Sequence, residues 1–169
     1  MGEQMDEQYS QNGSDVIYEL SASNPIFAAT GTAMVKVTVN GVETIRELPI
    51  QSVDVEDVNR LVGPEPPIPN RATGGNPKFV PDPEQPQYKE KIQERNRRFV
   101  MAMACFGLRI PIKDKQGEVV WSADNTVKDL NKAIEALHDA GIVYSQIFAI
   151  TRAINDLTTF AEDTATQDS

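Results

Sequence analysis

The chain contains very few of the residues that build most catalytic and metal sites. Among its 169 residues are one cysteine, Cys105, and one histidine, His138. A single cysteine excludes a disulfide within the chain and a cysteine cluster for structural zinc, and it fits a reducing compartment. A single histidine gives a catalytic triad or a histidine-based metal site only one member. The sequence therefore predicts no enzyme, no cofactor and no metal.

Long apolar runs and a targeting pattern are also lacking. The longest apolar stretch, residues 99–108, is interrupted and falls well short of the roughly 20 residues that span a bilayer. The first fifteen residues hold four acidic side chains and no lysine or arginine, unlike the positive start of a secretory or mitochondrial signal. We therefore expect neither membrane insertion nor targeting to another compartment.

Positive charge is scarce in the chain as a whole, whose formal net charge is −9. Such a chain repels nucleic-acid phosphates and anionic membranes, so neither is expected as a partner. Its length allows one domain or two very small ones, and neither small part could bury a large core alone. We expect the parts to pack against each other or against a protein partner.

Proline is concentrated in one place. Eight of the eleven prolines lie between Gly63 and Gln87, with Gly74-Gly75 among them. Proline lacks a backbone donor and restricts the residue before it, so an extended or mobile linker is favoured there. The sequence predicts an α+β fold in five parts: a disordered acidic arm (1–22), a β-hairpin with a short helix (23–63), a proline-rich linker (64–87), a helical unit (88–161) and a disordered tail (162–169).

A β-hairpin is the clearest local prediction, with strands at residues 34–39 and 42–48 around Asn40-Gly41. Asn-Gly favours the positive φ values of a tight turn, and three valines alternate with polar residues along the first strand. One face of that strand should be buried. Residues 15–20 have weak strand character.

The hairpin register has two alternatives. A two-residue loop pairs Val37 with Thr44, whereas a three-residue loop pairs Val37 with Ile45. The second gives the better apolar pair and is slightly favoured.

A short helix is expected after the hairpin and should end at Gly63. Ser52 is the predicted N-cap, and the carboxylates of Asp54, Glu56 and Asp57 favour the positive end of the helix dipole. The same three carboxylates have the composition of a hard-metal site, but they lack the alternating ligands and turn glycine of a calcium loop. We interpret them as a helix start.

Three helices are predicted beyond the linker. The first runs from Tyr88 to Phe106, and the third covers residues 145–161. The second is opened by Thr126 with Asp129 and stopped by Gly141. Residues 108–121 are expected to be irregular, with a turn at 114–117 and a short strand or packed loop at 119–121.

Neither Cys105 nor His138 is predicted to be catalytic. Cys105 lies on the apolar side of the first of these helices, where a buried structural thiol is the expected role. His138 lies near the end of the second helix, where the negative end of the dipole favours its charged form.

One cluster of positive charge stands out in this acidic chain. Its members are Lys89, Lys91, Arg95, Arg97 and Arg98, with Glu90 and Glu94 between them. The cluster is either a solvated helix face with some internal ion pairs, or a docking surface for an acidic partner or the chain's own acidic N-terminal arm.

The order of these elements resembles that of the tail assembly chaperones of long-tailed phages. The resemblance covers residues 34–160. It rests on the hairpin, the acidic helix start after Ser52, the connector, the helix ending at Cys105-Phe106, and two further helices joined at 140–142 and ending in the run 153–157. It is one of order and pattern rather than of a short motif. The proline-rich connector is unusually long for the family, and residues 1–33 are not accounted for.

The resemblance implies a small, non-enzymatic protein of the host cytoplasm. Such chaperones keep the tape measure protein soluble and bring tail tube subunits to it. The partners would then be the tape measure protein and the tail tube protein, with self-association into a homo-oligomer left open. The alternatives are a structural virion protein of the tail or head-to-tail connector and, third, a small enzyme.

A chaperone for a long helical client needs apolar surface beyond its own core. The third predicted helix carries an apolar stripe wider than a narrow seam, although a buried core helix would explain it equally well. The residues expected to bind a partner are Phe148, Leu157 and Phe160 on this helix, and Arg95, Arg97 and Arg98 in the basic cluster.

Overall fold

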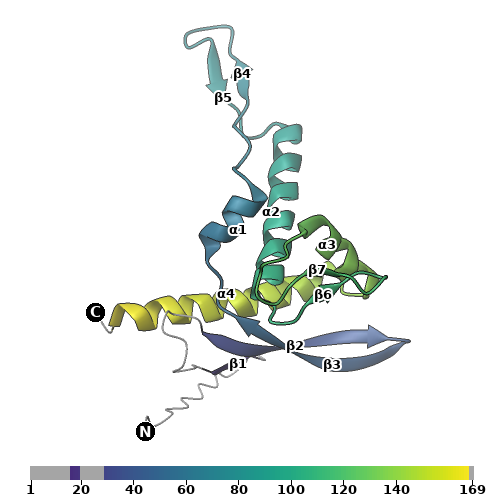
Figure 1. Ribbon diagram of the computed structural model, residues 1–169. Helices are drawn as coiled ribbons and strands as arrows, with labels where there is room; N and C mark the ends of the chain where they lie inside the picture. The colour runs from purple at the N-terminus through teal and green to yellow at the C-terminus, as the bar shows by residue number, and fades with distance from the viewer. Residues whose placement is uncertain (1–15, 20–28, 168–169) are drawn as a thin grey trace.

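The chain forms a mixed α+β fold, as the sequence predicts. The computed structural model describes residues 16–19 and 29–167. A three-stranded antiparallel sheet in the order β1-β2-β3 lies against the long helix α4 (Tyr144–Gln167), and helix α2 (Pro86–Gly107) stands upright on this base (Figure 1). The core forms where the sheet, α2 and α4 meet, so the front and back parts of the chain fold as one body.

Strands β2 (Thr30–Val39) and β3 (Val42–Gln51) form the predicted hairpin and extend further toward the base than expected. The favoured register is wrong, because Val37 pairs with Thr44 and not with Ile45. Asn40 and Gly41 have φ of 52° and 78°, so the loop has two residues. Apolar pairing did not set the register; the turn did.

Strand β1 (Val16–Glu19) pairs antiparallel with the beginning of β2. From sequence this segment has only weak strand character and falls within the predicted disordered arm, so that part of the prediction is wrong. The rest of the predicted arm, residues 1–15 and 20–22, lies outside the described residues.

Helix α1 (Val55–Val62) ends at Gly63 as predicted, but Ser52 is not its N-cap. Asp54 caps the helix, its Oδ1 accepting from the Glu56 amide at 2.8 Å. Ser52 instead continues the pairing of β2 with β3 by one residue: its Oγ accepts from the Ala29 amide at 3.1 Å, and its own amide donates to the Ala29 carbonyl at 2.8 Å.

The proline-rich stretch is not an unstructured linker. It folds into a second hairpin, with β4 (Asn70–Ala72) antiparallel to β5 (Phe79–Pro81), and its last residues begin α2 at Pro86. Proline suits the first turn of a helix, where its missing donor would have no helical partner. The hairpin projects from the upper end of α2, away from the base (Figure 1).

The first half of α2 is largely solvent-facing, and its second half is buried. The buried part ends at Gly107, one residue beyond the predicted end. A Cβ built on Gly107 would lie 2.3 Å from Cδ1 of Ile154 on α4. Glycine is therefore required for the close approach of the two helices.

A small hairpin and a helix cover the lower side of α2. Strands β6 (Ile112–Lys113) and β7 (Val119–Trp121) flank the predicted turn, in which the Gly117 amide donates to the Asp114 carbonyl at 3.0 Å. Helix α3 (Leu130–Asp139) begins later than expected, because Asp129 is its N-cap. Thr126 instead belongs to the turn before it, where its amide donates to the carboxylate of Asp124.

Helix α4 packs across both halves of the chain. Its continuation to Gln167 contradicts the predicted end at 161 and the disordered tail from 162. In the second half of α4, Thr158 Oγ1 accepts a hydrogen bond at 3.0 Å from the amide of Val53, which lies just before α1. The buried stripe of α4 that faces α2 and the sheet consists of Ile147, Ile150, Ala153, Ile154, Leu157 and Ala161.

Candidate protein-binding surface

Exposed apolar side chains flank the buried stripe of α4 where this helix begins. Val143, Tyr144 and Phe148, here called the α4 patch, are 54, 42 and 53% exposed. Tyr144 and Phe148 are four residues apart and are therefore neighbours on the helix surface. Ile147, between them in sequence, is 1% exposed. The helix is thus apolar on two sides at its start, and only one side is used by the core.

Two cations flank the α4 patch. The guanidinium carbon of Arg97 on α2 lies 5.9 Å from the centre of the Tyr144 ring, within the range of a cation–π contact. Arg152 lies one helical turn beyond Phe148 and is exposed. In a chain of net charge −9, this is a small area where apolar and positive groups occur together.

The three apolar residues predicted to bind a partner have different environments. Phe148 is exposed, as a partner-binding residue must be. Leu157 is fully buried, so its assignment to a binding surface is wrong for this folded chain. Phe160 is half-buried. Most apolar side chains in the predicted stripe of α4 therefore belong to the core, and Phe148 is the exposed exception.

The predicted basic cluster does not form one surface, because its three arginines point to three different elements. Arg95 donates through Nε to the Gly63 carbonyl at 3.1 Å and through Nη2 to Asn59 Oδ1 at 3.2 Å, so it clamps α2 to the end of α1. Arg98 donates to Asn131 Oδ1 on α3 at 2.8 Å. Arg97 alone lies beside exposed apolar groups.

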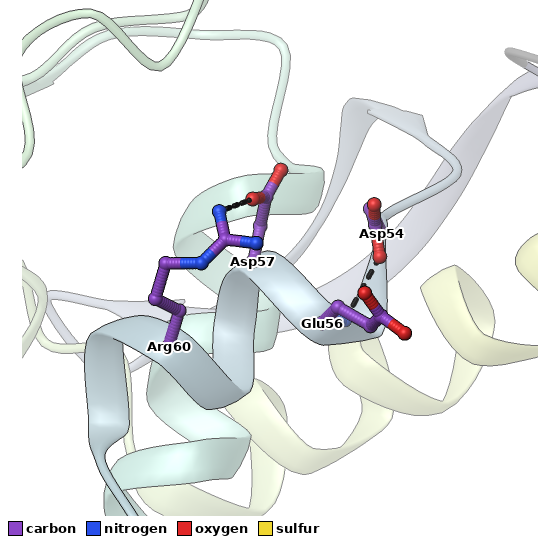
Figure 2. Close-up of polar contacts among 4 residues, drawn as sticks. All are labelled: Asp54, Glu56, Asp57 and Arg60. Atoms are coloured by element: carbon purple, nitrogen blue, oxygen red, sulfur yellow. Dashed lines mark hydrogen bonds and ion pairs between the residues drawn. The ribbon is translucent and has the colours of Figure 1, made fainter.

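The acidic start of α1 acts as a helix cap. Figure 2 shows the Asp54 carboxylate directed at the Glu56 amide, and Asp57 turned to Arg60 with Oδ1 at 2.8 Å from Nη1. The carboxylates of Asp54 and Asp57 thus have separate partners and do not converge. Within the described residues, no group of three or more histidine, cysteine, aspartate or glutamate side chains is placed to hold a metal ion.

Cys105 and His138 have different environments, since one is buried and the other is exposed. Cys105 is fully buried in α2, and desolvation raises the pKa of its thiol to about 12. A thiol with such a pKa is protonated at neutral pH and is a poor nucleophile. His138 lies exposed in the last turn of α3, the position that its charged form favours.

Two further apolar surfaces were not anticipated from the sequence. The outer half of the β2–β3 hairpin exposes Val42 (64%) and Ile45 (60%), and the β4–β5 hairpin exposes Phe79 (62%). A two-residue turn predicts that Ile45 is exposed, because this register puts Ile45 on the face opposite Val35 and Val37. An aromatic residue within a proline-rich stretch was the available signal for Phe79.

Known proteins offer no guide to these surfaces. No protein-family model, curated protein or solved structure matches the chain. Among the helices of the described residues, none has both the length and the apolar character needed to cross a bilayer.

Proposed function

We propose that this chain is a phage tail assembly chaperone, which binds the tape measure protein in the host cytoplasm and promotes tail tube assembly without catalysis. The observation that carries the proposal is Phe148, about half exposed on a helix whose adjacent stripe is buried. Exposed aromatic groups of this kind are common anchors at protein interfaces. The order of elements that resembles the family supports the same role.

The α4 patch suits one stripe of an amphipathic helix. Tyr144 and Phe148 are spaced to contact apolar groups on successive turns of a client helix. Arg97 and Arg152 lie beside them and favour acidic residues at the edge of that stripe. A client helix held in this way would have its apolar side covered until tube subunits replace the chaperone.

A structural virion protein of the tail or head-to-tail connector is the second candidate. The observation that favours it is the outer edge of β3, which pairs with no strand from Val42 to Leu48 in the described part of the chain. An open edge is a common site for permanent strand addition. Mass spectrometry of purified virions separates the two functions, because a chaperone is expected to be absent and a structural protein present in many copies.

The direct test is co-expression with the tape measure protein encoded by the same phage. Phe148→Asp should leave the fold intact by circular dichroism and strongly reduce the soluble fraction of the client. Val127→Asp is the matched control, since Val127 is a similarly exposed apolar residue (45%) outside α4. It should leave client solubility unchanged. A folded Phe148→Asp variant that solubilises the client as well as the natural chain would refute the proposed role of the α4 patch.

A further inference from the structure

The proline-rich stretch forms a projecting arm, defined here as residues 66–83. None of its residues is buried. Its hairpin is nevertheless built with defined pairing: the Asp82 amide donates to the Pro69 carbonyl at 2.7 Å, and the Thr73 amide donates to the Lys78 carbonyl at 2.9 Å. An isolated two-stranded hairpin is only marginally stable in water and usually needs a further layer or strand. The arm lacks such a layer within the described chain.

The base of the arm is fixed in direction. Arg95, with a side chain only 15% exposed, holds the Gly63 carbonyl and Asn59 where the chain leaves α1. The arm then continues upward beyond α2, while the sheet lies at the opposite end of the molecule (Figure 1). The arm and the sheet of one chain are thus held apart.

The two faces of the arm differ in chemistry. Ala72 pairs with the exposed Phe79, which makes one face apolar. Arg71 pairs with Val80 on the other face, and alternation places Lys78 there as well. Arg71 lies 3.9 Å from Asp82 but remains 67% exposed. The arm contains these two cations and one acidic side chain, Asp82.

The outer half of β3 has the complementary pattern. Glu43, Ile45 and Glu47 alternate along one face and are all exposed, with Lys36 across from Ile45. Val42 is exposed on the other face. Along these residues β3 pairs with β2 on one side, and its other edge pairs with no strand of the described chain.

We infer that the arm of one copy lies along the open β3 edge of a second copy. Strand addition of this kind aligns faces as well as edges. β4 is the strand that adjoins β3, because Pro81 keeps β5 at an edge. Arg71 then lies beside Glu43 or Glu47, and Lys78 and Val80 extend the same face from the outer strand. Phe79 lies on the other face, which is the face of Val42. The arm and the β3 edge are at opposite ends of the folded molecule. The contact therefore joins two different surfaces and repeats head to tail, which gives a ring or an open filament. The inference does not depend on the proposed chaperone function.

Sedimentation velocity of the pure full-length chain, without a client, tests the arm. The natural chain should show growth of oligomers between about 1 µM and about 500 µM, the range of a weak to moderate interface. Phe79→Ser should weaken association by about thirtyfold or more if Phe79 is an interface anchor. Its thermal unfolding should not change, since the side chain is exposed. A natural chain that stays monomeric throughout, or a Phe79→Ser variant that associates normally, overturns the inference.

Charge reversal tests the receiving edge. Lys78→Glu should weaken association, and Lys113→Glu, the same change at an exposed position on β6, should not. Adding Glu43→Lys or Glu47→Lys to Lys78→Glu in the same chain should restore association. If neither double variant associates better than Lys78→Glu alone, the β3 edge is not the receiving surface. Client solubilisation by a monomeric Phe79→Ser variant would leave the chaperone proposal standing whatever the outcome here.

Discussion

Replacing Gly107 by alanine is expected to destabilise the fold by about 1 to 3 kcal/mol, the usual cost of overpacking a core. Alanine is the better helix former by up to about 1 kcal/mol, so propensity alone predicts the opposite sign. The clash outweighs it here, because the new Cβ would lie 2.3, 2.6 and 2.7 Å from three side-chain atoms of Ile154. Ile154 is fully buried, and its β-branched side chain has few other rotamers within a helix.

Urea unfolding followed by circular dichroism measures this cost, and a double-mutant cycle assigns it to the contact. Ile154→Ala alone should cost about 2 to 5 kcal/mol through the cavity it leaves. In that background Gly107→Ala should cost nothing or even stabilise, because the clashing atoms are gone. Gly75→Ala in the arm is the control: a Cβ there meets nothing within 4 Å, and its stability effect should be within about 0.5 kcal/mol. A Gly107→Ala penalty of equal size with and without Ile154 would refute the steric explanation.

Three other predictions concern single groups. Leu157→Ala should lower the free energy of unfolding by about 2 to 5 kcal/mol in urea titrations, because Leu157 is core; an effect below about 1 kcal/mol would return it to the surface. The Asp124 carboxyl should titrate near pH 2 by NMR, since hydrogen bonds from the Ser122 and Thr126 hydroxyls lower its pKa from 3.8 to about 2. This lowered pKa gives stability that is present above the unfolded pKa and lost as the pH falls toward 2. Ser122→Ala should raise the pH midpoint of the Asp124 titration. An unchanged midpoint would contradict the assignment of the lowered pKa to these hydrogen bonds. Cys105, whose pKa burial raises to about 12, should resist a thiol reagent at pH 8 until denaturant is added; rapid labelling of the folded chain would show that its helix opens readily.

Local signals in the sequence predicted those elements whose cause is local. Asn40-Gly41 gave the hairpin, and Gly63 and Gly141 gave two helix ends, because φ preferences act within a few residues. The predicted N-cap of α1 was wrong, because Ser52 and Asp54 are both good N-caps and the contact between Ser52 and Ala29 decides between them. That contact joins residues 23 positions apart, and no short window contains it.

The proline-rich stretch was misread for a related reason. Proline excludes central strands but allows short edge strands, and all the strands of a two-stranded hairpin are edges. Composition alone therefore could not separate a mobile linker from the β4–β5 hairpin.

The candidate surface was predicted only in part. Periodicity placed Phe148 and Leu157 on one helix, but a wide apolar stripe does not say which side the rest of the chain covers. Packing of α2 and the sheet buried Leu157 and left Phe148 exposed. The arginines could not be assigned to partners because Asn59, Asn131 and Tyr144 are distant in sequence.

The hydrogen bond from the Val53 amide to Thr158 Oγ1 has a consequence for synthesis of the chain. It joins residues 105 positions apart, and α4 also packs on β2 and α2. Ribosomes add roughly 5 to 20 residues per second. Several seconds therefore pass between synthesis of the sheet and synthesis of the helix that covers it. During that interval the apolar face of β2 and the open β3 edge are both exposed to other nascent chains. Folding of this protein is therefore expected to complete only after translation has passed α4, and truncated chains that end before residue 144 should aggregate rather than fold.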